Sequence, residues 1–297
     1  MIGEPEAQPE TGTAEPSMPA DGTSRPTYVI DASRSGWMSR LGEAFGRREL
    51  LWMLVRRDIS VRYREAVLGV AWAVVVPAAS LGVYWFVFDV VFERQADDVP
   101  YVVFLFPAML VWNYYSSSVG RAANALVKDS ALLSKVYFPR ILLPLGNVIS
   151  PLLDFAIGLL VLVALLVVYK IVPTTQLLWL PLFLGVGMAA ATGMGMLMAS
   201  LNAQFKDVQH VLPVMMHLWF FSSPVLYPAS RVPERFQFFY SLNPMVTVCE
   251  GARFAVLGTA FPLSPQTVLM GLASTAVLLV VGFAAFMRTE QTITDLL

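Results

Sequence analysis

The chain contains six long apolar runs, each close to the length of a membrane-spanning helix. A helix needs about 20 mostly apolar residues to cross a hydrocarbon core about 30 Å thick. The runs cover residues 66–92, 101–119, 141–169, 177–201, 211–227 and 263–287. Of the 297 residues, 57% are hydrophobic and 14% are charged, whereas a soluble domain carries about 25% charged residues. The sequence therefore predicts an all-α integral membrane protein with six transmembrane helices.

Two segments precede the first run. Residues 1–36 are acidic at first and then rich in Ser, Thr, Pro and Gly, without the apolar stretch of a signal peptide. A segment of this composition buries too little apolar surface to fold, so we expect a disordered cytoplasmic tail. Residues 37–65 are expected to form an amphipathic interface helix region, and residues 66–297 the six-span transmembrane domain.

The distribution of basic residues predicts the orientation. With six spans and a cytoplasmic N-terminus, 15 of the 20 Lys and Arg residues lie in cytoplasmic segments. Because cytoplasmic loops carry an excess of Lys and Arg, both termini are expected in the cytoplasm. The net charge of −1 gives no indication of a nucleic-acid partner.

The segment before the first run combines a short apolar stretch, Leu50–Val55, with arginines on both sides. This pattern is typical of a helix lying on an anionic membrane surface. A soluble helix packed on a partner protein is the alternative, and both interpretations can hold together. The candidate interface residues are Trp52, Arg56, Arg57, Arg62 and Arg64.

A second amphipathic segment, residues 121–136, separates the second and third runs. Its apolar side chains fall on one helical face and its charges mainly on the other, and Pro139 ends it. We expect a short cytoplasmic helix parallel to the membrane, either a plain connector or a lever moved by a partner. Its candidate contact residues are Asn124, Lys128, Asp129, Ser134, Lys135, Phe138 and Arg140.

The segment between the last two runs is too polar to span a membrane and too apolar for a free loop. Asn243 is a suitable N-cap, Pro244 suits the first helical position, and Gly258 suits a helix end. We expect one or two short helices that dip into the outer leaflet and line or cap a cavity.

Chemistry-bearing motifs are scarce. The sequence has no Walker A pattern and no zinc-protease pattern, and Ser222 and Ser223 have no adjacent base, so no catalytic residue and no metal ligand is predicted. Prolines inside or at the ends of the runs should kink the helices, and Gly193 and Gly195 should let helices pack closely.

Asp89 and Asp154 fall within apolar runs. They are either functional carboxylates or carboxylates bonded to a neighbouring helix end.

Aromatic side chains are abundant in the first, second and fifth runs. They form either ordinary interfacial belts or the lining of a path on which sugar rings stack. The candidates for a path are Tyr84, Trp85, Phe88, Trp112, Tyr114, Tyr115, Trp219 and Phe220.

Four separated stretches together resemble one family of membrane proteins. They read RRDISVRYREAVLGVAWAVVVP, LLSKVYFPRILLPL, NAQFKDVQHVLPVMMHLWFFSSPVLYP and SLNPM, in this order along the chain. In sequence and order they resemble the membrane subunits of type-2 ABC exporters of polysaccharides, such as O-antigen, and of teichoic acids.

The resemblance implies a homodimer of six-span permeases in the bacterial cytoplasmic (inner) membrane, paired with two copies of a separate ATP-binding subunit. ATP and Mg would bind to that subunit, and this chain would bind no cofactor and act as a permease, not as an enzyme. Residues 124–136 would form the coupling helix, and the arginine-rich helix the interface helix. Asn243, Pro244, Glu250 and Arg253 would belong to outer gate helices, and the aromatics would line the channel for a lipid-linked glycan.

Two other functions remain open. One is a type-2 ABC exporter of drugs or lipids, which would share the fold but carry a different cargo. The other is an ion-coupled lipid flippase, which would need acidic residues facing a central cavity. The sequence does not identify the polymer, its lipid carrier or the mode of translocation.

Overall fold

The computed structural model describes residues 46–64, 71–91, 95–96, 99–128 and 139–296. The chain divides into two units, Met1–Gly36 and Trp37–Leu297, and every described residue belongs to the second. The predicted tail, residues 1–36, and the start of the first apolar run, residues 66–70, lie outside the described residues.

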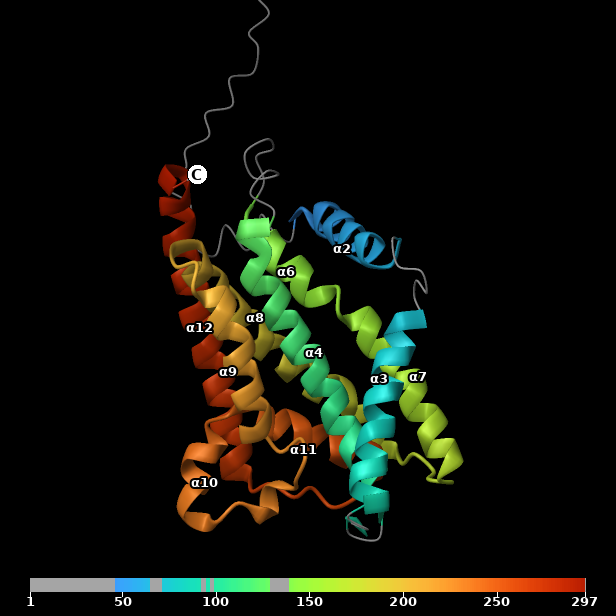
Figure 1. Ribbon diagram of the computed structural model, residues 1–297. Helices are drawn as coiled ribbons and strands as arrows, with labels where there is room; N and C mark the ends of the chain where they lie inside the picture. The colour runs from blue at the N-terminus through green and yellow to red at the C-terminus, as the bar shows by residue number, and fades with distance from the viewer. Residues whose placement is uncertain (1–45, 65–70, 92–94, 97–98, 129–138, 297) are drawn as a thin grey trace, which may run out of the picture. The chain divides into compact units, whose positions relative to one another are not determined.

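The described part of the chain is built almost entirely of helices (Figure 1). The α-helices are α2 (Arg48–Arg64), α3 (Trp72–Trp85), α4 (Tyr101–Lys128), α6 (Leu142–Ile149), α7 (Leu152–Val168), α8 (Leu180–Gln204), α9 (Val208–Ser222), α10 (Glu234–Ser241), α11 (Pro244–Leu257) and α12 (Pro265–Leu296). A π-helix, η2 (Phe86–Val91), and two 3-10 helices, η3 (Thr175–Trp179) and η4 (Ala229–Arg231), supplement them. Within the described residues, β-structure is limited to the antiparallel pair β1 (Gln95–Ala96) and β2 (Val99–Pro100).

In the part of the chain that the structure describes, four helical segments are long and apolar enough to cross a membrane. They are Tyr101–Lys128, Leu142–Val168, Thr175–Gln204 and Pro265–Glu290, which correspond to the second, third, fourth and sixth predicted spans. The first and fifth apolar runs form shorter helices, the apolar stretch Val74–Phe88 and the 15-residue α9. The class of an all-α membrane protein is confirmed, and the number of six crossings stays a prediction.

Helix α4 forms the centre of the helix packing. It contacts α6, α7, α8 and α11, and α8 in turn packs against α12. In the most apolar stretch of α4, 83% of the residues are buried, against 17% in α12. The stretch of α12 from Val268 to Met287 contains no charged residue, so its exposed face is suited to hydrocarbon and not to water.

Helix α4 is longer than the sequence pattern predicts. A separate helix beginning at Arg121 was expected, but α4 runs without interruption from Tyr101 to Lys128. The expectation of a second helix starting there is wrong, because the alanine-rich stretch after Gly120 favours continuation and contains no proline. The rest of the predicted coupling segment, including Asp129, Ser134, Lys135 and Phe138, lies outside the described residues.

The third apolar run is divided into α6 and α7 at Ser150 and Pro151, as the proline predicted. Pro151 has no N–H to donate to the preceding turn. Leu153 N bonds Ser150 O, three residues back, at 3.4 Å, so the hydrogen-bond ladder is weak at this point. We call Ser150 and Pro151 the break.

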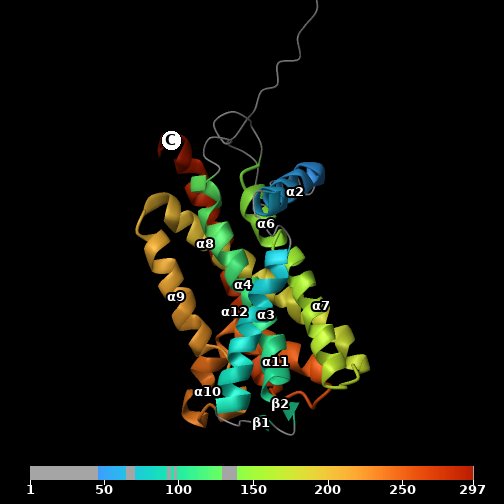
Figure 2. The ribbon, with the colours of Figure 1, turned by 45° about the vertical axis from the view of Figure 1, so that its right-hand side comes forward.

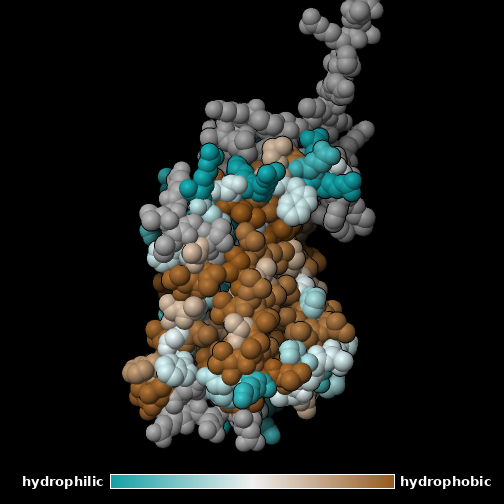
Figure 3. Space-filling model, turned by 90° about the vertical axis from the view of Figure 1, so that its right-hand side faces the viewer, coloured by the Kyte–Doolittle hydropathy of each residue, from teal (hydrophilic) through white to brown (hydrophobic). Residues whose placement is uncertain are grey.

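The elements form two groups at opposite ends of the long helices. Helices α2 and α6 lie at one end with the C-terminal end of α12, and α10, α11 and the β1–β2 pair lie at the other end (Figures 1 and 2). Between these ends, one face of the molecule shows a band of hydrophobic side chains (Figure 3). Exposed residues such as Val83, Leu160 and Val167 are apolar, as expected for a lipid-facing surface.

Small residues bring α8 and α12 into backbone contact, as the glycines predicted. A Cβ atom on Gly193 would lie within 2.6 Å of Leu279 N, and one on Gly282 would collide with the Gly193 carbonyl. Close approach of this kind is a common way for helices to associate in a bilayer, where the hydrophobic effect between helices is absent.

Replacing Gly193 by Leu should therefore separate α8 from α12 and lower the stability by about 1–3 kcal/mol, the usual cost of overpacking. Gly185 on the same helix is exposed, and a Cβ atom added there would meet nothing within 4 Å, so Gly185→Leu is the matched control. Thermal unfolding of the detergent-solubilised protein, followed by fluorescence-detected gel filtration, measures both variants. Equal midpoints for the two variants would contradict the packing argument.

Candidate functional site

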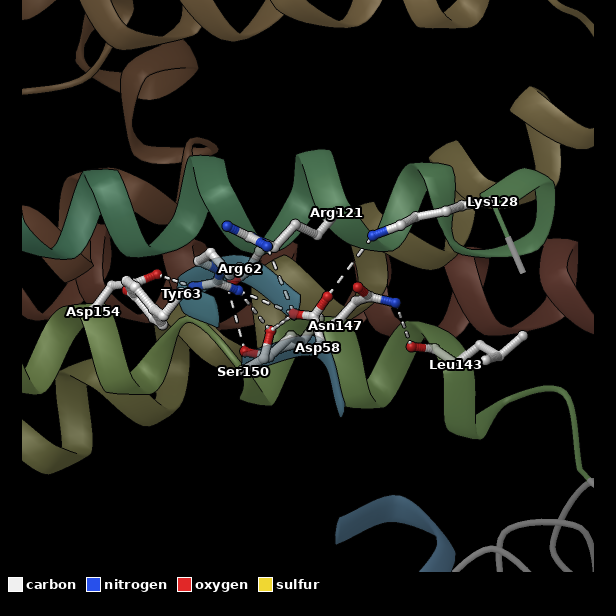
Figure 4. A network of polar contacts seen from close by, with 11 residues as sticks. Asp58, Arg62, Tyr63, Arg121, Lys128, Leu143, Asn147, Ser150 and Asp154 are labelled. Carbon is white, nitrogen blue, oxygen red and sulfur yellow. Dashed lines mark hydrogen bonds and ion pairs between the residues drawn. The ribbon is translucent and has the colours of Figure 1, made fainter. Parts of the chain in front are cut away.

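Asp58 of α2 lies at the centre of a network of charges at one end of the helices (Figure 4). The Arg62 Nη2 atom lies 3.0 Å from Asp58 Oδ2, and the Arg121 Nη1 atom of α4 lies 3.6 Å from the same oxygen. The Ser150 hydroxyl donates a hydrogen bond to Asp58 at 2.5 Å, and Lys128 Nζ lies 3.9 Å from the other carboxylate oxygen. One carboxylate thus connects α2, the end of α4 and the break.

Arg62 extends this network to the first turn of α7. It donates to the Ser150 hydroxyl at 3.2 Å and also pairs with Asp154, which accepts a further hydrogen bond from the Tyr63 hydroxyl. Asp154 is therefore bonded to the last turn of α2, which agrees with the second of its two interpretations. We call Asp58, Arg62, Tyr63, Arg121, Lys128, Ser150 and Asp154 the Asp58 network.

The environment of Asp58 alters its acidity. Partial burial alone would raise the pKa of Asp58, but the Ser150 hydrogen bond and the charges of Arg121, Arg62 and Lys128 outweigh it. The pKa of Asp58 is therefore lower than its ordinary value of 3.8, and the carboxylate is charged at neutral pH.

The predicted interface residues of α2 divide between two faces. Leu54 and Val55 are buried, with Leu54 Cβ 3.6 Å from the position of a Cβ on Gly146 of α6. Trp52 is 67% exposed. Arg56, Arg57 and Arg64 are also exposed, whereas Arg62 turns inward to the Asp58 network. Helix α2 thus has one face fixed to α6 and one face open.

The described residues of the predicted coupling segment have different environments. Asn124 donates to Gly120 O at 2.8 Å and accepts from the Asn202 amide of α8 at 3.2 Å, so it holds α4 to α8. The Lys128 side chain is 64% exposed. Arg140 donates to Glu290 O of α12 at 3.1 Å.

A groove of about 460 Å³ lies along α4, between α3 and α9. Its polar lining comes from α4 residues at helical spacing, Asn113, Ser116, Gly120 and Asn124, and from Gln209 and His217 of α9. A few polar groups on an otherwise apolar wall are typical of binding sites for organic ligands.

Three of the predicted path aromatics line this groove. They are Tyr84, Trp112 and Phe220, and the rings of Trp112 and Phe220 meet edge to face at 5.7 Å. Their place in a substrate path stays a prediction, which the groove supports.

The other predicted path aromatics lie outside the groove lining. Tyr114 and Tyr115 are buried, and the Tyr114 hydroxyl donates to Val148 O at 3.0 Å. Trp219 donates to Asn243 at 2.9 Å, and Phe88 packs on Tyr101 with ring centroids 4.6 Å apart. Trp85 is exposed. The positions of Tyr114, Tyr115, Phe88 and Trp85 favour packing or membrane contact, whereas Trp219 lines a separate, largely apolar groove of about 930 Å³ between α9, α10 and α12.

Helix α11 begins and ends as the sequence predicted. The Asn243 side chain accepts from Met245 N at 3.0 Å, Pro244 occupies the first turn, and Gly258 ends the helix in the left-handed conformation with φ 69°. The Asn243 amide also donates to the Ser223 hydroxyl at 2.9 Å. This cap therefore joins α11 to the end of α9.

A buried ion pair inside α11 holds the chain segment that follows α9. The Arg253 Nη1 atom lies 3.0 Å from the Glu250 carboxylate, and both side chains are 3% exposed. Arg253 also donates to Val225 O at 2.7 Å and to Phe104 O of α4 at 3.1 Å. Glu250 accepts from Ala229 N at 2.7 Å. The pair, which we call the α11 clamp, thus satisfies backbone groups from two other segments, α4 and the segment after α9.

Sequence reasoning missed Asp58 and Ser150. A signal was present, because Leu54, Asp58 and Arg62 are spaced four apart and share the buried face of α2. An acidic residue on that face next to a basic one indicates an internal ion pair. Nothing in the sequence pointed to Ser150 as the partner, since the contact joins positions 92 residues apart.

The fold and these sites define a helical membrane protein with a charged network at one end, a groove along its central helix and a buried clamp at the other. The chain matches the family described as ABC-2 type transporter over residues 49–257, and it belongs to that family.

Curated relatives give the same result. The chain is 33% identical over 208 residues to an O-antigen export system permease protein RfbA of Myxococcus xanthus, covering 69% of this chain and 79% of that protein. It is 28% identical over 201 residues to an O-antigen export system permease protein RfbA of Klebsiella pneumoniae, covering 67% and 77%. It is 25% identical over 209 residues to the polysialic acid transport protein KpsM of Escherichia coli, covering 69% and 80%.

Replacing Arg253 by Ala should leave the Glu250 charge and two backbone carbonyls buried without their donor, at a cost of about 3–5 kcal/mol. The exposed Arg231 provides the control, because Arg231→Ala changes the total charge equally without opening the clamp. Thermal unfolding in detergent should show a large loss for Arg253→Ala and almost none for Arg231→Ala. A small loss for both would show that the clamp contributes little.

The Asp58 network should make the stability depend on pH in a defined direction. Because the folded-state pKa of Asp58 is lower than 3.8, the ionised carboxylate stabilises the fold above that pH. This contribution is lost as the pH falls through the lowered value. The stability difference between the wild type and Asp58→Asn should therefore be constant near neutrality and shrink below pH 3.8. Unfolding midpoints measured across this range test the sign, with Asp207→Asn as control, because Asp207 is exposed before α9 and its side chain makes no capping hydrogen bond.

Proposed function

We propose that the chain is the membrane-spanning subunit of an ATP-driven exporter that moves a lipid-linked polysaccharide from the cytoplasmic to the outer face of the bacterial inner membrane. The observation that carries the proposal is the groove along α4, which combines aromatic faces with amide and hydroxyl groups. The family, and relatives named for O-antigen export and polysialic acid transport, support this class of cargo.

The groove chemistry suits a glycan. Sugar rings present apolar faces that stack on the partly exposed rings of Tyr84 and Phe220, and Trp112, which is only 4% exposed, packs edge to face against Phe220. The sugar hydroxyls find partners in Asn113 and Ser116. The groove residues Met109, Leu212 and Met216 add an apolar wall. Contacts of this kind accept different sugar units as a repeating polymer passes.

The proposed complex is a homodimer of this chain with two ATP-binding subunits that carry ATP and Mg. The open face of α2, with Trp52 and its exposed arginines, supports α2 as the interface helix on the membrane surface beside those subunits. Lys128, exposed at the end of α4, and the residues that follow it would form the coupling segment.

The proposed topology has six spans and both termini in the cytoplasm. The position of α2 and the C-terminal end of α12 at the same end of the long helices supports it (Figure 1). Helices α10 and α11, at the opposite end, would then be the outer gate helices, with Asn243 and Pro244 at their junction and Glu250 and Arg253 in the clamp.

Truncating Trp112 or Phe220 to Ala should lower export about two- to tenfold each, because both changes remove the edge-to-face ring contact in the groove wall and such a contact contributes about 0.5–1.5 kcal/mol beyond buried area. Export is measured as glycan accessible to enzymes outside cells that lack the native permease. Phe221→Ala is the matched control, because Phe221 adjoins Phe220 but does not line the groove. Full export by both groove variants, or equal loss in the control, would contradict the proposed path.

A further inference from the structure

We propose that Asp58 is a positioning residue that makes α2 and the break between α6 and α7 move as one body. The role of α2 and the break in transport rests on the proposed function. Their attachment to each other rests on contacts between described residues alone. The inference starts from the geometry of the Asp58 network, in which two neighbouring turns of α2 hold both sides of the break (Figure 4).

The break is bracketed by α2 side chains. Asp58 accepts from the Ser150 hydroxyl at 2.5 Å on the α6 side, and Arg62 pairs with Asp154 on the α7 side. Arg62 also donates to the same Ser150 hydroxyl at 3.2 Å. Since Ser150 is fully buried and bonds both α2 residues, α2 cannot shift along α6 without losing several of these contacts.

The break is also the point at which the third apolar run can bend. Pro151 removes one backbone hydrogen bond, and the neighbouring bond from Leu153 is long. A bend here changes the direction of α7, whereas α6 stays fixed to α2 through Leu54 and Gly146. The side chains of Asp58 and Arg62 therefore bond to both sides of a weak point in this run.

Charge makes the attachment specific. The Asp58 side chain is 11% exposed and faces three cations, Arg62 of its own helix and Arg121 and Lys128 of α4. Hydrogen bonds with a charged partner are stronger than neutral ones and hold a narrow geometry. A neutral amide at this position would keep the shape but weaken the attraction to both α4 and the Ser150 hydroxyl. The carboxylate is therefore what keeps α2, α4 and the break in one arrangement.

The test is a distance measured within one chain of the assembled transporter. Spin labels on cysteines at Val61 of α2 and Leu160 of α7 report on the unit, because both side chains are exposed and the native Cys249 is buried. Labelled chain is diluted with unlabelled chain, so that each complex carries one labelled copy. The distance is measured without nucleotide and with a non-hydrolysable ATP analogue.

In the wild type, the distance should be narrow and equal in the two states. Asp58→Asn and Ser150→Ala should broaden it and make it depend on nucleotide, Asp58→Glu should restore a narrow distribution, and Asp207→Asn should behave as wild type. The amount of glycan exported per ATP hydrolysed should fall about tenfold in Asp58→Asn. Losing a hydrogen bond to a charged group shifts the ratio of attached to detached α2 by about that factor.

Two results would overturn the inference: a wild-type distance that changes with nucleotide, or an Asp58→Asn distance identical to the wild type. Failure of the proposed function has a different signature, since the distances would follow the expected pattern while the wild-type complex exports no glycan. Ser150→Ala keeps the test decisive where Asp58→Asn does not assemble, because it leaves all the charges in place.

Discussion

Every site in the molecule depends on the burial of one continuous helix. Helix α4 contributes Phe104 to the α11 clamp, Asn113 to the groove and Arg121 to the Asp58 network. At 1.5 Å per residue its 28 residues measure about 42 Å. Its neighbours cover it on several sides, and α4, with Pro107 inside it, is the central helix against which the other helices pack.

The continuation of α4 through Arg121, where a separate helix was expected, therefore affects how the sites are connected. The sequence from residue 121 onward is amphipathic, but amphipathicity does not say whether a helix is new or continues the one before it. A proline or glycine would be needed to end α4, and residues 121–128 contain neither. The continuation puts Arg121 and Lys128 on the same uninterrupted helix as the groove, so that the charge at one end and the polar lining in the middle share one hydrogen-bonded backbone.

Local features of the fold could be predicted from the sequence, and tertiary pairings could not. Asn243, Pro244 and Gly258 define the ends of α11 through their own backbone preferences, and Pro151 divides its run for the same reason. Which aromatics line the groove depends instead on how α3 and α9 turn toward α4, and periodicity carries no such information. The same holds for the Asp58–Ser150 contact, because two polar residues far apart in the sequence give no signal until the helices are packed.

The two charged sites differ in how readily they can rearrange. In the α11 clamp both charges are almost completely buried and bond backbone groups of α4 and of the segment after α9, so opening it would leave charges without solvent or partner. In the Asp58 network, Lys128 is largely exposed and its 3.9 Å contact is long, so this ion pair can separate into water at little cost. The clamp therefore fixes the arrangement of α4, α11 and the segment after α9 at one end. The Asp58 end combines firm attachment of α2 to the break with a loose contact to the end of α4, so the end of α4 can separate from α2 while the bonds to the break persist.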